Sequence, residues 1–427
     1  METAFRMALL AQFVKPLFGL DDLFARFAID QNLRGFGSDI EVIEQQALAQ
    51  IDEFQAAGVA ATVKHWPGEG FDDRDQHLLT TINPLSMADW QASFGRLYRA
   101  AIGAGVMSVM SGHIALPAYV LAQSPDAGVQ AYRPATVSRA LNLDLLRGEL
   151  GFNGLIVSDA TPMAGFGSWA PRATMLPEVI ENGCDIILFS RDAAADVALI
   201  TAAVADGRIS AARLDQALTR VLGLKAWAGL HKGADKVNRA ALATQANKAA
   251  AQAVTARVPT LVKDVNGLLP LTTHKHRRIL VVSTGVVMPF VPAPVPFDLP
   301  AMLTAEGFEV TLYTPGLQPG PQDFDLMLYL FGEETLLTRG RIFLDWLRIT
   351  GHFGTAMARY WHEIPTLMIS FGYPYYLYDA PRVPAYVNAY ATTPSMQRAV
   401  LDCLLGRAEW NRLSPVDPYC GLPDARF

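Results

Sequence analysis

The chain is poor in cysteine, and its few thiols are scattered. Only three of its 427 residues are cysteines, Cys184, Cys403 and Cys420, and their spacing matches neither a disulfide framework nor a zinc-ligand motif. Isolated thiols of this kind are typical of a reducing compartment. We therefore expect a cytoplasmic protein with no structural disulfides.

The chain also has little charge and no long, unbroken hydrophobic run. Charged residues make up 18% of the sequence and the formal net charge is −6, so the basic surface that nucleic acid or an anionic membrane requires is not expected. The uncharged run most suggestive of a membrane span, 279–297, is crowded with prolines in its last nine residues, which excludes a membrane-spanning helix. Glu2, Arg6 and Lys15 interrupt the apolar N-terminus, which is unlike a secretory signal. Because 51% of the residues are hydrophobic, a largely disordered chain is also excluded.

The first half alternates between short apolar runs and amphipathic stretches. The apolar runs predict parallel strands covered on both faces, at 59–65, 105–114, 154–160 and 184–190. A helix is expected to begin at Ser38, which forms a capping box with Glu41. A second should begin at Ser210 and present one apolar stripe, made of Leu214, Leu218, Val221 and Leu222. This alternation predicts a parallel sheet or a (β/α) barrel.

A second alternating series follows an alanine-rich connector. Its strands are predicted at 279–284, 308–313, 325–331 and 365–372. The expected fold class is α/β, an incomplete (β/α) barrel followed by a smaller open α/β sandwich domain. The predicted boundaries are 1–227 for the barrel portion, 228–257 for a helical linker and 258–427 for the second domain.

Polar residues follow three of the predicted strands of the first half. Lys64 and His65 open the segment KHWPGEGFDDRDQH, which also contains Asp75 and His77. Asp75 lies two residues before His77, where it can orient the imidazole for proton transfer. His113 and Asp159 stand at the ends of the next two strands. Because the loops after parallel strands face one common mouth, these groups are expected to gather there.

Each of these signals also has an ordinary structural explanation. A strand-end carboxylate such as Asp159 is often a helix N-cap, and His113 alone is more typical of a hydrogen-bonded structural histidine. The charges of 72–77 are compatible with a solvated loop. Their joint placement at consecutive strand ends favours a functional site.

The segment 64–77 resembles the signature of the family-three glycoside hydrolases, in the β-N-acetylglucosaminidase branch. In that signature Lys-His-(Phe/Trp)-Pro-Gly-(His/Glu) is followed by Asp-(Ser/Thr)-His, and here Gln76 stands in place of the Ser or Thr. LRGFGSD (33–39) and GLIVSDA (154–160) resemble the family's sugar-contacting arginine segment and its nucleophile strand. TLVKDVNGLLPL (260–271) resembles part of its C-terminal domain.

The resemblance implies a retaining β-N-acetylhexosaminidase acting on aminosugar glycosides. It places the nucleophile at Asp159 and the acid/base at His77, assisted by Asp75. The residues that would contact the sugar are Arg34, Lys64, His65 and His113. It implies no metal and no organic cofactor. A β-glucosidase of the same family and a non-catalytic sugar-binding or scaffold protein remain the alternatives.

One part of the family pattern is absent. The family's Asp-x-Glu-Gly-Gly-Arg motif does not occur, and only 63 residues precede Lys64, which predicts a barrel lacking its first strands and a weak activity. An open sheet edge must be covered. We expect the N-terminal segment, which includes the apolar residues 8–20, to pack against the exposed side of strand 59–65, or a homodimer to form there.

Overall fold

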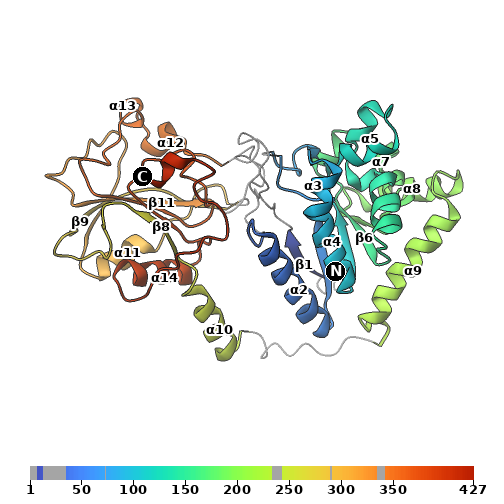
Figure 1. The fold of residues 1–427 in the computed structure, drawn as a ribbon, viewed down its shortest axis with the longest axis horizontal. Helices are drawn as coiled ribbons and strands as arrows, with labels where there is room; N and C mark the ends of the chain where they lie inside the picture. Colours follow the sequence, from blue (N-terminus) through green and yellow to red (C-terminus); the bar gives the residue numbers. More distant parts are fainter. Residues whose placement is uncertain (1–6, 13–34, 73, 233–242, 289–290, 334–341) are drawn as a thin grey trace. The chain divides into compact units, whose positions relative to one another are not determined.

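The computed structural model describes residues 7–12, 35–72, 74–232, 243–288, 291–333 and 342–427. The chain forms two compact units that divide at Lys236 (Figure 1). Each unit contains its own sheet and its own hydrophobic core.

The first unit is built on a parallel sheet of five described strands in the order β1-β2-β4-β6-β7. Their bounds are Met7–Gln12 (β1), Ala60–Trp66 (β2), Ser108–Ser111 (β4), Leu155–Ala160 (β6) and Ile186–Leu188 (β7). All four strands expected in this half are present, and the run 105–114 also supplies β5 (Ile114–Ala115), which pairs with β3 (Thr81–Ile82). The parallel, barrel-like architecture predicted from the alternation is therefore confirmed for this unit.

Helices cover the sheet of the first unit. They are α2 (Ile40–Ala56), α3 (Met87–Ala92), α4 (Phe94–Gly103), α5 (Pro117–Gln123), the π-helix η4 (Ala140–Glu149), α6 (Ala164–Gly167), α7 (Arg172–Glu181), α8 (Ala193–Ala205) and α9 (Ala211–Trp227). The 3₁₀ turns Gly128–Tyr132, Ala135–Val137 and Leu230–Lys232 complete the set of described helical segments. The main core joins α2, α4 and α7 to one face of the strands, and a smaller cluster joins α9 to the other. The strands are thus buried on both faces, as their apolar sequences require.

Two details of the predicted helices differ in the structure. The N-cap of α2 is Asp39, whose Oδ1 accepts from the amide of Val42 at 3.0 Å, and not Ser38. The α9 helix does begin after Ser210, but Leu218 and Leu222 are 48% and 61% exposed. The predicted apolar stripe was too wide, because α9 lies at the margin of the unit and only its inner residues find partners.

The open side of β2 is covered by the N-terminal segment. Of the two arrangements expected there, packing of this segment and formation of a homodimer, the structure shows the first. Strand β1 pairs in parallel with β2, with Met7, Ala8 and Leu9 opposite Ala60, Ala61 and Thr62. The remainder of the apolar stretch 8–20, from residue 13 on, lies outside the described residues. This pairing supplies the backbone partners that the exposed edge of β2 would otherwise lack.

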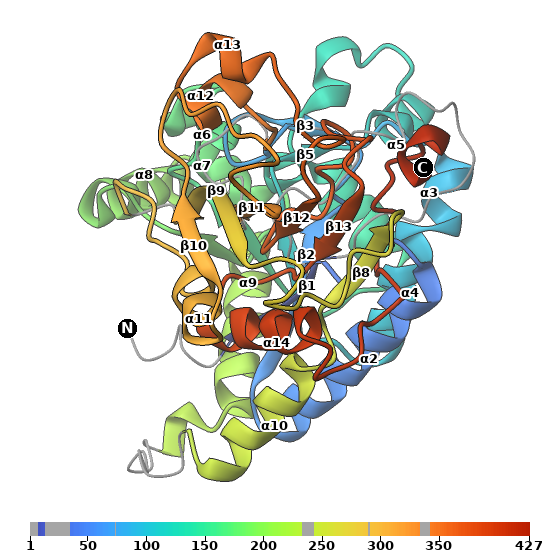
Figure 2. The same ribbon diagram turned by 90° about the vertical axis from the view of Figure 1, so that its left-hand side faces the viewer.

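The second unit contains a six-stranded mixed sheet in the order β10-β9-β11-β12-β13-β8, which Figure 2 shows from β10 to β8 across the view. The strand bounds are Thr260–Asp264 (β8), Arg278–Val287 (β9), Glu309–Leu312 (β10), Leu326–Glu333 (β11), Thr366–Ser370 (β12) and Ala385–Asn388 (β13). The sequence predicted β9 to β12 and missed β8 and β13, whose sequences TLVKD and AYVN contain polar residues and form no continuous apolar run. Only β8 runs antiparallel to its neighbour.

The helices of the second unit are short. They are α10 (Gln245–Thr255), α11 (Leu299–Ala305), α12 (Trp346–Thr350), α13 (Phe353–Ala356), α14 (Pro394–Leu404) and the 3₁₀ turn Pro423–Arg426. The α10 helix accounts for the described part of the alanine-rich connector. Within the described ranges, no helix has the length and apolar character needed to cross a membrane.

Candidate active site

Three neighbouring strands of the first unit carry the predicted polar residues to one edge. Lys64 and His65 lie in β2, His113 follows β4, and Asp159 lies in β6. Because β2, β4 and β6 are adjacent and parallel, their carboxyl ends meet at one edge of the sheet. The loop after β2 brings Asp75 and His77 to the same place, where His77 lies near Asp159.

Asp159 is a buried carboxylate held by two amide donors. Its Oδ1 accepts from the backbone amide of Ala160 at 2.7 Å, and its Oδ2 accepts from Nε2 of Gln76 at 2.7 Å. The side chain is almost fully enclosed, and this burial raises the pKa of Asp159. The nearby His65, His113 and His77, together with the Ala160 amide, lower that pKa by more, so the net shift is to below the ordinary value. The carboxylate is therefore ionised at neutral pH.

His77 is paired with Asp75 through its ring. Its Nδ1 lies 2.6 Å from Oδ1 of Asp75, which leaves Nε2 for other contacts. Burial lowers the pKa of His77, but the hydrogen bond to Asp75 and the charge of Asp159 outweigh it and raise the pKa above the ordinary value. An imidazole with this partner can deliver and recover a proton near neutral pH.

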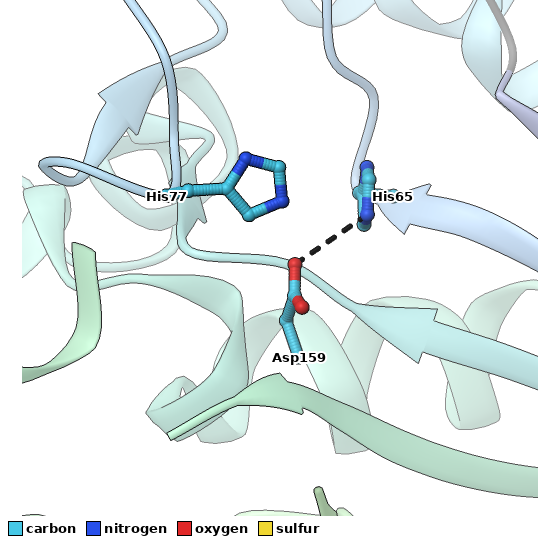
Figure 3. Close-up of side chains that lie close together, drawn as sticks. All are labelled: His65, His77 and Asp159. Atoms are coloured by element: carbon cyan, nitrogen blue, oxygen red, sulfur yellow. Dashed lines mark ion pairs between the residues drawn. The ribbon is translucent and has the colours of Figure 1, made fainter. Parts of the chain in front are cut away.

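His65 and His77 lie on opposite sides of the Asp159 carboxylate (Figure 3). The His65 ring itself lies between two carboxylates. Its Nδ1 is 2.6 Å from Oε2 of Glu69, and its Nε2 is 3.4 Å from Oδ2 of Asp159. Burial lowers the pKa of His65 even though both carboxylates raise it. The His65 ring thus contacts Oδ2 of Asp159 on one side and Glu69 on the other.

The other sequence-predicted residues are placed differently. His113 is fully buried, with Nδ1 3.0 Å from Oγ1 of Thr136 and Nε2 3.2 Å from the carbonyl oxygen of Ala160. Both ring nitrogens thus contact the protein, which is the arrangement of a histidine that supports the end of β6. Lys64 is buried at the end of β2. Arg34 lies outside the described residues.

Sequence reasoning missed two residues of the site, Gln76 and Glu69. Gln76 was visible only as a departure from the Asp-(Ser/Thr)-His pattern, and nothing in the sequence shows that its amide reaches Asp159, which is 83 residues away. Glu69 occupies the last position of the Pro-Gly-(His/Glu) signature, and its contact with His65 could have been suspected from the spacing of four residues.

Among the described residues, His65, His77 and Asp159 are the group whose atoms could surround a metal ion. One ligand atom from each lies within 4.8 Å of the others. Ligands of a tetrahedral zinc ion stand about 3.3 Å apart, because each bond is about 2.0–2.1 Å long. His65 Nε2 and Asp159 Oδ2 already lie 3.4 Å apart, so it is His77 that would have to move to close such a site.

The arrangement brings together the two kinds of group that cleavage of a glycoside uses, a carboxylate and a proton donor. One nitrogen of His77 and one oxygen of Asp159 lie no more than 4.8 Å apart, so a carboxylate and a group able to transfer protons are close together.

Comparison with known proteins agrees with this chemistry. Residues 26–224 match the model of the glycosyl hydrolase family 3 N terminal domain. A protein of Cellulomonas fimi named "Beta-N-acetylglucosaminidase/beta-glucosidase" is 39% identical over 421 residues, which cover 93% of this chain and 72% of that protein.

Two further matches differ in extent. A "Beta-hexosaminidase" of Stenotrophomonas maltophilia (strain R551-3) is 32% identical over 166 residues, which are 39% of this chain and 46% of that protein. The solved structure titled "Beta-glucoside phosphorylase BglX" is 32% identical, has a TM-score of 0.87, and covers 98% of this chain and 75% of its own. The chain therefore spans under half of the Stenotrophomonas protein and about three quarters of the other two.

Proposed function

Because this chain belongs to glycosyl hydrolase family 3, we propose that it cleaves terminal β-linked N-acetylglucosamine through a covalent glycosyl-enzyme. The observation that carries the proposal is the pairing of an ionised, buried Asp159 with a His77 held by Asp75. The name of the Cellulomonas fimi relative, at 39% identity, supports the substrate class.

In the first step an oxygen of Asp159 bonds to the anomeric carbon as the bond to the leaving oxygen breaks. Protonated His77 gives its proton to that oxygen, and Asp75 stabilises the imidazolium beforehand and orients the ring. In the second step neutral His77 takes a proton from the incoming acceptor, whose oxygen bonds to the anomeric carbon as the bond to Asp159 breaks. Microscopic reversibility thus lets one histidine serve both steps.

A second candidate is β-glucoside cleavage with inorganic phosphate as the acceptor. The structural match titled as a phosphorylase supports it, because it aligns with 98% of this chain. A histidine in the acid/base position supports it as well. A neutral imidazole does not repel an incoming phosphate dianion, whereas a carboxylate base would.

The test compares chromogenic aryl β-N-acetylglucosaminide and aryl β-glucoside, each with and without inorganic phosphate. Release of free N-acetylglucosamine, independent of phosphate, supports the first proposal. Acceleration by phosphate with formation of a sugar 1-phosphate supports the second. A folded chain that releases no aryl group from either substrate, and is not labelled by a 2-fluoro sugar, contradicts both.

A further inference from the structure

The side-chain amide of Gln76 joins the proposed nucleophile to the strand beside it. Its Nε2 donates to Oδ2 of Asp159 at 2.7 Å, and its Oε1 accepts from the backbone amide of His113 at 2.7 Å. Gln76 is fully buried, so water does not compete for these bonds. The sequence singled out this residue only as a departure from the family signature.

The orientation of this amide is determined by its neighbours. A backbone N–H can only donate, so the Gln76 atom facing His113 must be the oxygen. The NH₂ group is then left to face Asp159, and an ionised carboxylate can only accept. Each end of the Gln76 amide thus has a partner of the correct type.

Two glycines allow the backbone of neighbouring segments to approach Gln76 closely. A Cβ on Gly112 would lie 3.2 Å from Oε1 of Gln76, and a Cβ on Gly165 would lie 1.9 Å from the Gln76 carbonyl oxygen. Backbone therefore lies close to the Gln76 side chain at Gly112, directly after β4, and close to the Gln76 carbonyl oxygen at Gly165 in α6. The side chain is preorganised, so no reorganisation is needed as charge changes on Asp159.

We propose that Gln76 is a positioning residue that assists the departure of Asp159 from the glycosyl-enzyme. The proposal rests on the function proposed above. When Asp159 attacks, its negative charge is lost into the new carbon–oxygen bond, and the hydrogen bond from Gln76 weakens. When the acceptor oxygen bonds to the anomeric carbon, the electron pair of the breaking bond returns to the carboxylate, and the same hydrogen bond strengthens.

The hydrogen bond therefore favours the second step over the first. A hydrogen bond to a charged acceptor corresponds to a roughly ten- to hundredfold change in rate when it forms in the transition state. Replacing Gln76 should slow breakdown of the intermediate by about this factor. Its formation should change much less, because the bond is already weakening in that step.

Formation and breakdown of the glycosyl-enzyme can be separated by steady-state and burst kinetics. The substrate is the activated aryl glycoside that the wild type cleaves. For Gln76→Met, kcat and KM should fall together by about ten- to a hundredfold, and a burst of aryl alcohol should appear. Because kcat/KM reports formation of the intermediate, it should stay within a few-fold of wild type. Thr80→Val is the control, since Thr80 bonds the same loop to the carbonyl oxygen of Gly165 at 2.9 Å without reaching Asp159.

Gln76→Glu provides a second and nearly isosteric variant. Its carboxylate keeps an acceptor for the His113 amide, but only the protonated acid can donate to Asp159. The titratable groups nearby are Asp159, His65, His77 and His113. The wild type and the variant share them, so their effect on the pH profile cancels in the ratio of the two kcat values. The kcat of Gln76→Glu relative to wild type should therefore rise as pH falls, whereas the ratio for Gln76→Met should stay flat.

Two results overturn the inference. One is a parallel loss of kcat and kcat/KM in Gln76→Met with no burst, and the other is a Gln76→Glu ratio that does not depend on pH. Failure of the proposed function looks different, because the wild type itself would then form no glycosyl-enzyme on Asp159. Wild-type labelling at Asp159 by a 2-fluoro sugar, read by peptide mass, distinguishes the two failures.

Discussion

One oxygen of Asp75 binds His77 twice. Oδ1 accepts from the backbone amide of His77 at 2.9 Å and contacts its Nδ1 at 2.6 Å. The same carboxylate thus shapes the turn and orients the imidazole. Both contacts join residues that are only two positions apart, so the local sequence is sufficient to define the geometry of the Asp75–His77 pair.

Asp75→Asn is expected to shift the pH profile of the enzyme. Asp75 raises the pKa of His77, so its replacement lowers that pKa. Because the protonated imidazole is the proposed acid of the first step, the alkaline limb of kcat/KM should move to lower pH. His77→Ala should remove that limb and should harm substrates with poor leaving groups far more than activated aryl glycosides. An unshifted limb in Asp75→Asn would contradict the assignment.

Asp159→Asn should reduce turnover by roughly a thousandfold or more, because the variant lacks the proposed nucleophile of the covalent route. A 2-fluoro sugar should label a peptide that contains Asp159 in the wild type and leave the variant unlabelled. Peptide mass spectrometry measures both. Labelling confined to another carboxylate would show that Asp159 has a different role.

Gly165→Ala should displace the loop that carries Asp75 and His77, although Gly165 itself lies in the neighbouring helix α6. The new methyl group would meet the carbonyl oxygen of Gln76 at 1.9 Å and force the loop that carries Asp75 and His77 to move. A misplacement on the order of 1 Å can cost about a hundredfold in kcat/KM. Gly167→Ala in the same helix α6 has no heavy atom within 4 Å of the added Cβ and is the matched control. Equal activity of the two variants would contradict the close approach.

Asp185 is expected to be a main determinant of stability in the first unit. Its carboxylate is buried and accepts from Arg147 at 2.8 Å, from Arg213 at 2.5 Å and from the amide of Ile156 at 2.9 Å. Asp185→Ala leaves two guanidinium groups without this partner and should reduce the free energy of unfolding by about 3–5 kcal/mol. Asp206→Ala breaks only a surface pair with Arg208 and should leave the thermal midpoint unchanged. Thermal unfolding followed by circular dichroism compares them.

The pairing of β1 with β2 can be tested by proline substitution. Successive residues of a regular strand direct their N–H groups to opposite sides, so only one of Ala8→Pro and Leu9→Pro, both in the regular part of the pairing, removes a bond to β2. One variant should lower the thermal midpoint more than the other and should increase self-association, because the edge of β2 becomes available. Sedimentation velocity measures the association. Two variants with the same midpoint and mass would contradict the pairing.

The sequence by itself determined the strand–helix alternation and the residues at the strand ends. Parallel strands buried on both faces must be nearly continuous apolar runs, and a carboxylate or imidazole directly after such a run, as at Asp159 and His65, is visible without coordinates. The Asp75–His77 pair was equally predictable, because its geometry is local. Strands β8 and β13 were missed, since they pair with each other across a long stretch of the chain and neither sequence reveals that partner.

Only the tertiary structure decided how the strand-end residues are used. It brought Gln76 against Asp159 across 83 residues, and it bound both ring nitrogens of His113 to the protein. It also placed β1 on the free edge of β2. Hydrogen bonds between segments far apart in sequence depend on sheet order and on close backbone approaches such as that at Gly165. Such approaches leave no periodic signal in the sequence, because they depend on which surfaces the packed core brings together.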